Sequence, residues 1–291
     1  MKIGISSYSL YQAMQAGEMT ILDVIDYVAD AGADHIEIVP VGFDLLNNIE
    51  LVNDIKNRAN DRGLEISNYA VGANFIQHSK EAYEEAIDIV KHHVDIAARL
   101  GATRMRHDVA SRSLHETSYA FFEKDLPLLI DACREIADYA KQYSVITSVE
   151  NHGFYIQASE RVLRLVRAVD RDNFKTTLDV GNFLCVDEDP IVGVANNLPY
   201  ASMVHFKDFY YRKADELPIK EGWLQTTSGR YLRGAIVGQG DIPIREIVTH
   251  MQENNYEGYV SIEFEGMEAC RKGAKLGLDT IKHLWKEGVK S

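Results

Sequence analysis

Cysteine and proline are both scarce in this sequence of 291 residues. Its 3 cysteines, Cys133, Cys185 and Cys270, are an odd number at wide spacing without a CxxC pair, which excludes a disulfide-stapled scaffold and favours a reducing compartment. The 6 prolines do not cluster, and no stretch has the composition of a linker or a low-complexity tract. We therefore expect one domain that spans residues 1–291.

Basic side chains and long apolar runs are also in short supply. Lys and Arg total 31 against 44 Asp and Glu, and the formal net charge of -13 opposes binding to nucleic acid or to an anionic membrane. No stretch approaches the roughly 18 uninterrupted apolar residues that span a bilayer. The first residues, MKIGISSYSL, lack the charged and apolar segments of a signal peptide. We expect a cytoplasmic protein whose partners are small molecules.

Short runs rich in β-branched and aromatic residues recur along the chain, and each is followed by a longer segment with helical periodicity. The eight expected strands are residues 2–8, 35–40, 65–71, 103–109, 146–151, 175–180, 203–209 and 259–265. This alternation predicts a single (β/α)8 TIM barrel with an extended loop after strand 7. A doubly wound open sheet is the alternative, but the first turn, ISSYSLYQAM, has neither GxGxxG nor GxxxxGK.

Local signals support the helix boundaries. Ser79 is a candidate N-cap, and Thr20 with Asp23 forms a candidate capping box. Gly32, Gly63 and Gly101 each precede an expected strand, where glycine accepts the left-handed conformation that ends a helix. The one irregular stretch, residues 210–241, is too long for an ordinary connection and ends in the turn-rich GQGD.

Ionisable residues stand at the ends of four consecutive strands, where burial without a partner would be costly. They are Glu150 in SVENHG, Asp179 in TLDVGNF, His205 in MVHFKDF and Glu263 in VSIEFEG. In a barrel, the carboxyl ends of the strands build the active site, so these side chains can converge there. Three carboxylates and one imidazole suit one divalent ion, best Mn²⁺ or Mg²⁺, with Co²⁺, Fe²⁺ and Zn²⁺ also compatible.

These four motifs, in this order, resemble the metal-binding signature of the sugar phosphate isomerase/epimerase family of xylose-isomerase-like TIM barrels. The resemblance covers essentially the whole chain. It implies that Glu150, Asp179, His205 and Glu263 bind one divalent metal and that Glu150 and Glu263 also act as the acid/base pair. Among the metals that suit this ligand set, Mn²⁺ is our first choice. The GQGD turn is similar to the Gly-x-Gly-acidic segment that precedes the last helix of the family.

The implied chemistry is proton transfer beside a carbonyl. A divalent cation chelated by a carbonyl and the adjacent hydroxyl acidifies the C–H between them and stabilises the resulting enediolate. Glu150 and Glu263 could return the proton to the other face or to the neighbouring carbon, which gives epimerisation or isomerisation. We therefore expect a divalent-metal-dependent isomerase or epimerase of a sugar or sugar derivative.

The sequence also departs from well-known members. Asn182 and Ile156 stand where ketose 3-epimerases carry a substrate-binding histidine and glutamate, and Asn182 also replaces a metal histidine of the type IV apurinic endonucleases. The His-x-Lys-Asp at residues 205–208 resembles the inosose dehydratases, and the metal subunits of C-glycoside deglycosidases share the scaffold. A lyase is the alternative function, and a non-catalytic metal- or sugar-binding barrel is a remote one.

Further polar residues are candidates for contacting a small carbohydrate substrate. His107 and His152 either face the site or are structural, and Lys207 either contacts substrate or pairs with Glu150 or Glu263. The full set of substrate-binding candidates is His107, His152, Asn182, Lys207, Arg233 and Trp223, with Tyr8, Asn68 and Asn74 as further lining residues. A homo-oligomer is left open.

Overall fold

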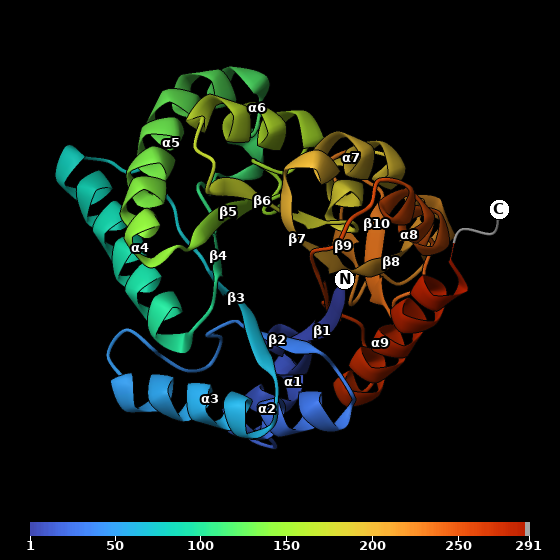
Figure 1. The fold of residues 1–291 in the computed structure, drawn as a ribbon. Helices are drawn as coiled ribbons and strands as arrows, with labels where there is room; N and C mark the ends of the chain where they lie inside the picture. Colours follow the sequence, from blue (N-terminus) through green and yellow to red (C-terminus); the bar gives the residue numbers. More distant parts are fainter. Residues whose placement is uncertain (289–291) are drawn as a thin grey trace.

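Eight parallel strands close into a barrel, with the helices packed around its outside (Figure 1). The computed structural model describes residues 1–288. Around the barrel the order is β1-β11-β7-β6-β5-β4-β3-β2, so neighbours in space are neighbours in sequence apart from the insertion between β7 and β11. The barrel strands are β1 (Lys2–Ser6), β2 (His35–Ile38), β3 (Glu65–Val71), β4 (Arg104–His107), β5 (Ile146–Glu150), β6 (Phe174–Asp179), β7 (Ala201–Phe206) and β11 (Tyr259–Ile262). The predicted TIM barrel is confirmed.

The helices bury one apolar side against the strands. They are α1 (Tyr11–Gln15), α2 (Ile21–Asp30), α3 (Ile49–Asp61), α4 (Lys80–Leu100), α5 (Tyr119–Ala140), α6 (Ser159–Val169), α7 (Pro190–Asn197), α8 (Ile244–Glu253) and α9 (Cys270–Glu287). The predicted caps are present: Thr20 and Asp23 form a reciprocal capping box at α2, and the Ser79 hydroxyl accepts from Ala82 N–H at α4. Gly32, Gly63 and Gly101 all have positive φ, as the sequence predicted.

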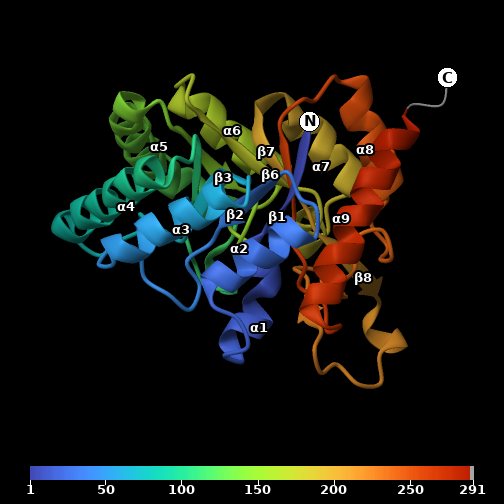
Figure 2. The same cartoon turned by 60° about the horizontal axis from the view of Figure 1, so that its bottom comes forward.

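The insertion after β7 is folded rather than irregular. Strands β8 (Asp208–Arg212), β9 (Leu224–Gln225) and β10 (Tyr231–Ala235) form a small antiparallel sheet with β10 between the other two. Figure 2 shows this insertion projecting at the same end of the barrel as α1, which follows the carboxyl end of β1. We call residues 208–235 the lid sheet.

Asp208 ties the base of the lid sheet to the GQGD turn. Its carboxylate accepts from the backbone N–H groups of Gly238 and Gly240, each at 2.9 Å, and from Ile242 N–H at 3.2 Å. A Cβ at Gly240 would lie 2.2 Å from Asp208 Oδ1, so only glycine fits at this position. The turn is therefore held against the segment that leaves β7.

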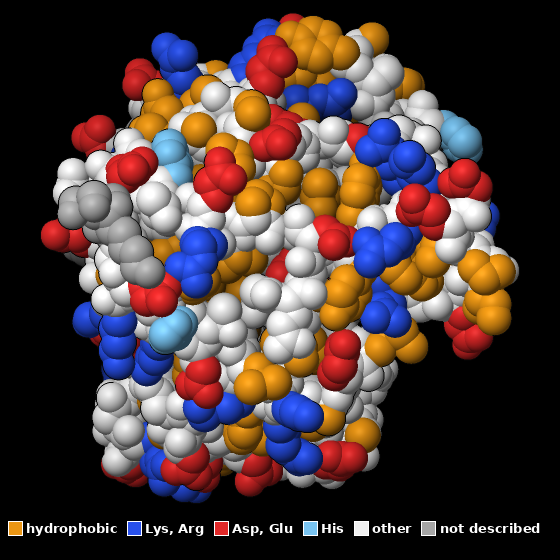
Figure 3. Space-filling view, turned by 90° about the vertical axis from the view of Figure 1, so that its right-hand side faces the viewer, with side chains coloured by type: hydrophobic (Ala, Val, Ile, Leu, Met, Phe, Trp, Pro, Cys, Tyr) orange, Lys and Arg blue, Asp and Glu red, His pale blue; other side chains and the backbone are white. Residues whose placement is uncertain are grey.

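Within residues 1–288, no helix is long and apolar enough to cross a bilayer. On the face formed around α8 and α9, acidic and basic side chains are interspersed rather than gathered into a patch of one sign (Figure 3).

Candidate metal centre

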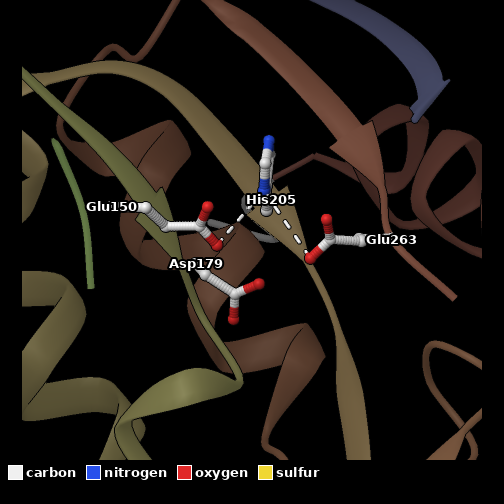
Figure 4. Close-up of side chains that lie close together, drawn as sticks. All are labelled: Glu150, Asp179, His205 and Glu263. Atoms are coloured by element: carbon white, nitrogen blue, oxygen red, sulfur yellow. Dashed lines mark ion pairs between the residues drawn. The ribbon is translucent and has the colours of Figure 1, made fainter. Parts of the chain in front are cut away.

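The four ionisable residues predicted as ligands converge at the carboxyl ends of their strands (Figure 4). Glu150 and Asp179 end β5 and β6, His205 lies near the end of β7, and Glu263 directly follows β11. Each offers one ligand atom, and these atoms all lie within 4.8 Å of one another. All four residues are buried, because the barrel wall and the loops above it enclose them.

The donor atoms of this cluster fit a cation. Gly181 N–H and Asn182 N–H each donate to Asp179 Oδ1 at 2.7 Å, whereas Asp179 Oδ2 and His205 Nδ1 are buried without a hydrogen bond among the described residues. Burial raises the pKa of Asp179 to about 7, and the negative charges of Glu150 and Glu263 add to this effect. A divalent cation would relieve the repulsion and complete the coordination of both atoms.

A carboxylate that the sequence analysis did not select contacts the Nε2 nitrogen of His205. Glu37, on β2, lies with its Oε1 3.0 Å from His205 Nε2 and accepts from Asn68 Nδ2 at 2.7 Å. Glu37 and His205 are fully buried. Part of the signal was available, because Glu37 is an ionisable residue inside the apolar run HIEIVP, but it does not stand at the end of that run as the four candidate ligands do.

Arg106, rather than His107, reaches the site from β4. Arg106 Nη2 lies 2.6 Å from Glu150 Oε2, and Nη1 donates to Val71 O at 3.2 Å. His107 is buried beside the rings of Phe75 and Phe174, with Nδ1 2.9 Å from Asp108 O, and does not line the cavity over the metal centre. Of the two alternatives for His107, this packing favours the structural one, because successive residues of a strand point to opposite faces.

Lys207 and Asn182 join the carboxylates into one network. Lys207 Nζ lies 2.8 Å from Glu263 Oε2, 3.3 Å from Glu265 Oε2 and 3.7 Å from Asp179 Oδ2. Asn182 donates to Glu150 Oε1 at 3.3 Å and accepts from Lys207 Nζ at 3.4 Å. Burial alone would lower the pKa of Lys207, but Glu263 and Glu265 raise it well above its ordinary value, so the ammonium stays charged.

A cavity of about 180 Å³ opens over these residues. Its lining includes Tyr8, Arg106, Glu150, His152 and Glu263. The His152 side chain is 47% exposed, and its Nδ1 lies 3.3 Å from Asp108 Oδ1. Burial acts to lower the pKa of His152, yet the Asp108 carboxylate raises it above the usual value. His152 therefore presents a carboxylate-supported imidazole to the cavity.

The structure does not bring Trp223 and Arg233 to this cavity lining. Both lie in the lid sheet, where the Arg233 guanidinium stacks 4.9 Å from the ring centre of Tyr210 and 5.4 Å from that of Trp223. An isolated bridge between Gly234 and Gly266 joins the lid sheet to the segment after Glu263. Their predicted substrate contacts therefore depend on a substrate that extends toward the lid sheet.

Known proteins resemble this chain in sequence and in fold. The family described as xylose isomerase-like TIM barrel matches residues 25–289. The chain belongs to this family. Among curated proteins, an inosose dehydratase of Clostridium perfringens is 24% identical over 213 residues, which cover 69% of this chain and 71% of the relative.

Solved structures share the fold of this chain at low sequence identity. The probable 3-DHS dehydratase AsbF of Bacillus anthracis superposes with a TM-score of 0.74 at 17% identity, covering 97% of this chain and 99% of the other. D-psicose 3-epimerase of Clostridium cellulolyticum H10 gives 0.70 at 17% identity, covering 98% and 99%. A Mycobacterium smegmatis member in complex with magnesium gives 0.71 at 19% identity, covering 98% and 97%. The fold thus occurs in epimerases, dehydratases and a magnesium complex.

Proposed function

We propose that this protein is a divalent-metal-dependent isomerase or epimerase of a sugar or sugar derivative, with Mn²⁺ as its native metal. The observation that carries the proposal is the buried cluster of Glu150, Asp179, His205 and Glu263, whose ligand atoms lie within 4.8 Å of one another. Within it, Glu150 and Glu263 approach from opposite sides of His205 (Figure 4). That placement suits proton removal from one face of a substrate and return on the other.

The residues around the metal centre have distinct tasks. A divalent ion held by the four ligands would polarise a substrate carbonyl and acidify the adjacent C–H. Burial disfavours the charged form of Glu150, but Arg106 and His205 outweigh it and hold its pKa well below the ordinary value, so Glu150 is available as a carboxylate. Lys207 Nζ can donate to Glu263 and steady it for proton transfer.

The size and polarity of the cavity support a small carbohydrate substrate. About 180 Å³ lined by Tyr8, Arg106, His152 and Lys207 offers hydrogen-bond donors for several hydroxyl groups and an aromatic ring at one side. Asn182, whose amide already bridges Glu150 and Lys207, would position these two groups rather than replace the histidine of the ketose 3-epimerases.

The test is solvent exchange at carbon. Protein stripped with a chelator and refilled with Mn²⁺ or Mg²⁺ is incubated with a panel of ketoses, aldoses and inososes in deuterated water. We expect deuterium at the carbon next to the carbonyl, dependent on the metal and lost in Glu150→Gln and Glu263→Gln. Asp125→Asn, which alters a buried carboxylate bound to Arg112 and Tyr155 outside the site, is the control. No exchange with any member of the panel would refute proton abstraction.

A lyase is the second candidate, and the pairing of His152 with Asp108 favours it. Elimination needs an acid that protonates the departing hydroxyl in addition to the base that removes the C–H proton. His152 lines the cavity and is supported by Asp108, and both the inosose dehydratase and the probable 3-DHS dehydratase are similar proteins. In the same assay a lyase forms a product lighter by one water, and His152→Gln suppresses that product while solvent exchange continues.

A further inference from the structure

We propose that Glu37 is a positioning residue of the metal centre, which selects the histidine tautomer that can bind the metal. The proposal rests on the metal site under "Proposed function" and assigns to Glu37 a part in it. Glu37 is on β2, 168 positions from His205 in sequence, and reaches it across the interior of the barrel.

Hydrogen bonding decides which nitrogen of His205 is free. A neutral imidazole carries one N–H and one lone pair, and a carboxylate accepts but cannot donate. Since Glu37 Oε1 lies 3.0 Å from His205 Nε2, the proton belongs on Nε2 and the lone pair on Nδ1. That nitrogen lies 3.6 Å from Glu150 Oε1 and 3.8 Å from Glu263 Oε2, on the side of the other ligands.

Glu37 is itself held in place by a neutral donor. Asn68 Nδ2 donates to the same oxygen, Oε1, at 2.7 Å. The other oxygen, Oε2, is buried without a hydrogen bond among the described residues. A fully buried carboxylate with an unsatisfied oxygen is an expensive way to stabilise a fold, because an apolar side chain of similar size would avoid the desolvation cost. The arrangement therefore serves the orientation and basicity of His205 rather than stability.

The first measurement is metal affinity. Mn²⁺ is titrated calorimetrically into metal-free wild type, Glu37→Gln, Glu37→Leu and the matched control Asp125→Asn, each first checked for cooperative thermal unfolding. We expect Glu37→Leu to bind Mn²⁺ about 10- to 100-fold more weakly. The Mn²⁺ affinity of Glu37→Gln should lie between those of Glu37→Leu and wild type, since the amide oxygen can accept a hydrogen bond from Nε2–H but carries no negative charge. Asp125→Asn should bind Mn²⁺ like wild type, even if it unfolds at a lower temperature.

The second measurement follows the tautomer directly. Ring ¹⁵N spectra of histidine-labelled, metal-free protein are recorded at a pH high enough to make His205 neutral, because burial acts to lower its pKa but the surrounding carboxylates raise that pKa well above the ordinary value. The His205 signals are identified by their absence in His205→Gln. We expect the Nε2–H form in wild type and loss of its dominance in Glu37→Leu, a change that a purely structural role would not produce.

The outcomes separate this inference from the proposed function. A wild type that binds no divalent metal would overturn the metal site and, with it, the proposed function. A wild type that binds Mn²⁺, together with a Glu37→Leu variant that matches its affinity within twofold and keeps the Nε2–H form, would overturn the role of Glu37 alone.

Discussion

Two layers of side chains inside the barrel stand two residues apart along the same strands and differ in character. The upper layer, at the carboxyl ends, comprises Arg106, Glu150, Asp179, His205 and Glu263. The lower layer comprises their neighbours on the same faces, Arg104, Ser148, Thr177, Met203 and Ser261. The upper layer consists of charged and ionisable side chains, whereas Arg104 is the one charged member of the lower layer.

The lower layer and the residues beneath it, at the amino ends of the strands, form contacts that stabilise the barrel. The hydroxyls of Ser148 and Thr177 share a hydrogen bond at 2.7 Å. Arg104 donates to Ser202 O at 2.9 Å and stacks 4.4 Å from the ring centre of Tyr259, against which His35 packs edge-on. In this family of folds the chemistry sits at the carboxyl ends and the opposite end supports the barrel. Along each of these strands, a step of two residues separates the side chain of the candidate metal centre from the side chain that stabilises the barrel.

The largest expected effect tests the upper layer against the residue below it. Asp179→Asn keeps an oxygen that can accept from Gly181 and Asn182 but removes a ligand charge, so Mn²⁺ affinity and turnover should fall at least about 100-fold. Its metal-free form should unfold no more easily than wild type, because repulsion among buried carboxylates is reduced. The counterpart Thr177→Val should instead cost about 1 kcal/mol of stability and leave metal affinity intact. Calorimetric titration and urea unfolding check both, and equal metal binding by the two variants would contradict the division.

The two arginines of β4 sharpen the comparison, since they point to the same face. Arg106→Gln removes the ion pair at Glu150 and should lower turnover at least about 10-fold. Arg104→Gln loses a hydrogen bond and the stacking on Tyr259, which should cost about 1 to 2 kcal/mol of unfolding free energy with turnover unchanged. Steady-state rates and urea unfolding are measured for both variants. A loss of turnover in Arg104→Gln, with turnover unchanged in Arg106→Gln, would show that the layers are misassigned.

Acidification should lower the free energy of unfolding through His35, which is buried at the amino end of β2. Burial lowers the pKa of His35 to about 4, against an ordinary value of about 6.5. The folded state therefore binds fewer protons than the unfolded state between these values, and stability present above pH 6.5 is lost as the pH falls toward 4. The loss is up to about 1.4 kcal/mol per pH unit for this group. Urea unfolding at several pH values gives the free energy of unfolding as a function of pH. Between pH 6.5 and 4 this free energy should fall less steeply in His35→Gln than in wild type, and an equal fall in both proteins would contradict the assignment.

The smallest effect concerns the lid sheet, which lies outside both layers. Trp223→Ala removes the indole ring that lies beside the Arg233 guanidinium and should change the free energy of unfolding by no more than about 1 kcal/mol. If the lid sheet contacts substrate, as the sequence predicted for Trp223 and Arg233, KM rises several-fold in Trp223→Ala and in Arg233→Ala while kcat stays near wild type. Unchanged KM in both variants would restrict the pair to the fold of the lid sheet.

The sequence by itself determined the barrel and the convergence of four candidate metal ligands. Strand and helix periodicities are local, so the alternation of eight units was readable without contacts. Because parallel strands end at one edge, ionisable residues at strand ends were expected to meet, and Glu150, Asp179, His205 and Glu263 do so.

Only the tertiary structure decided the phase of β4, the partner of His205 and the fold of the insertion. In RMRH, polar residues occupy both faces, so the pattern could not choose Arg106 over His107. Glu37 meets His205 only because the barrel closes through β11 and β1, which brings β2 within reach of β7 across the interior. The strands β8 to β10 form because Asp208 anchors their base and each strand finds a partner, which are contacts between distant residues that no local pattern contains.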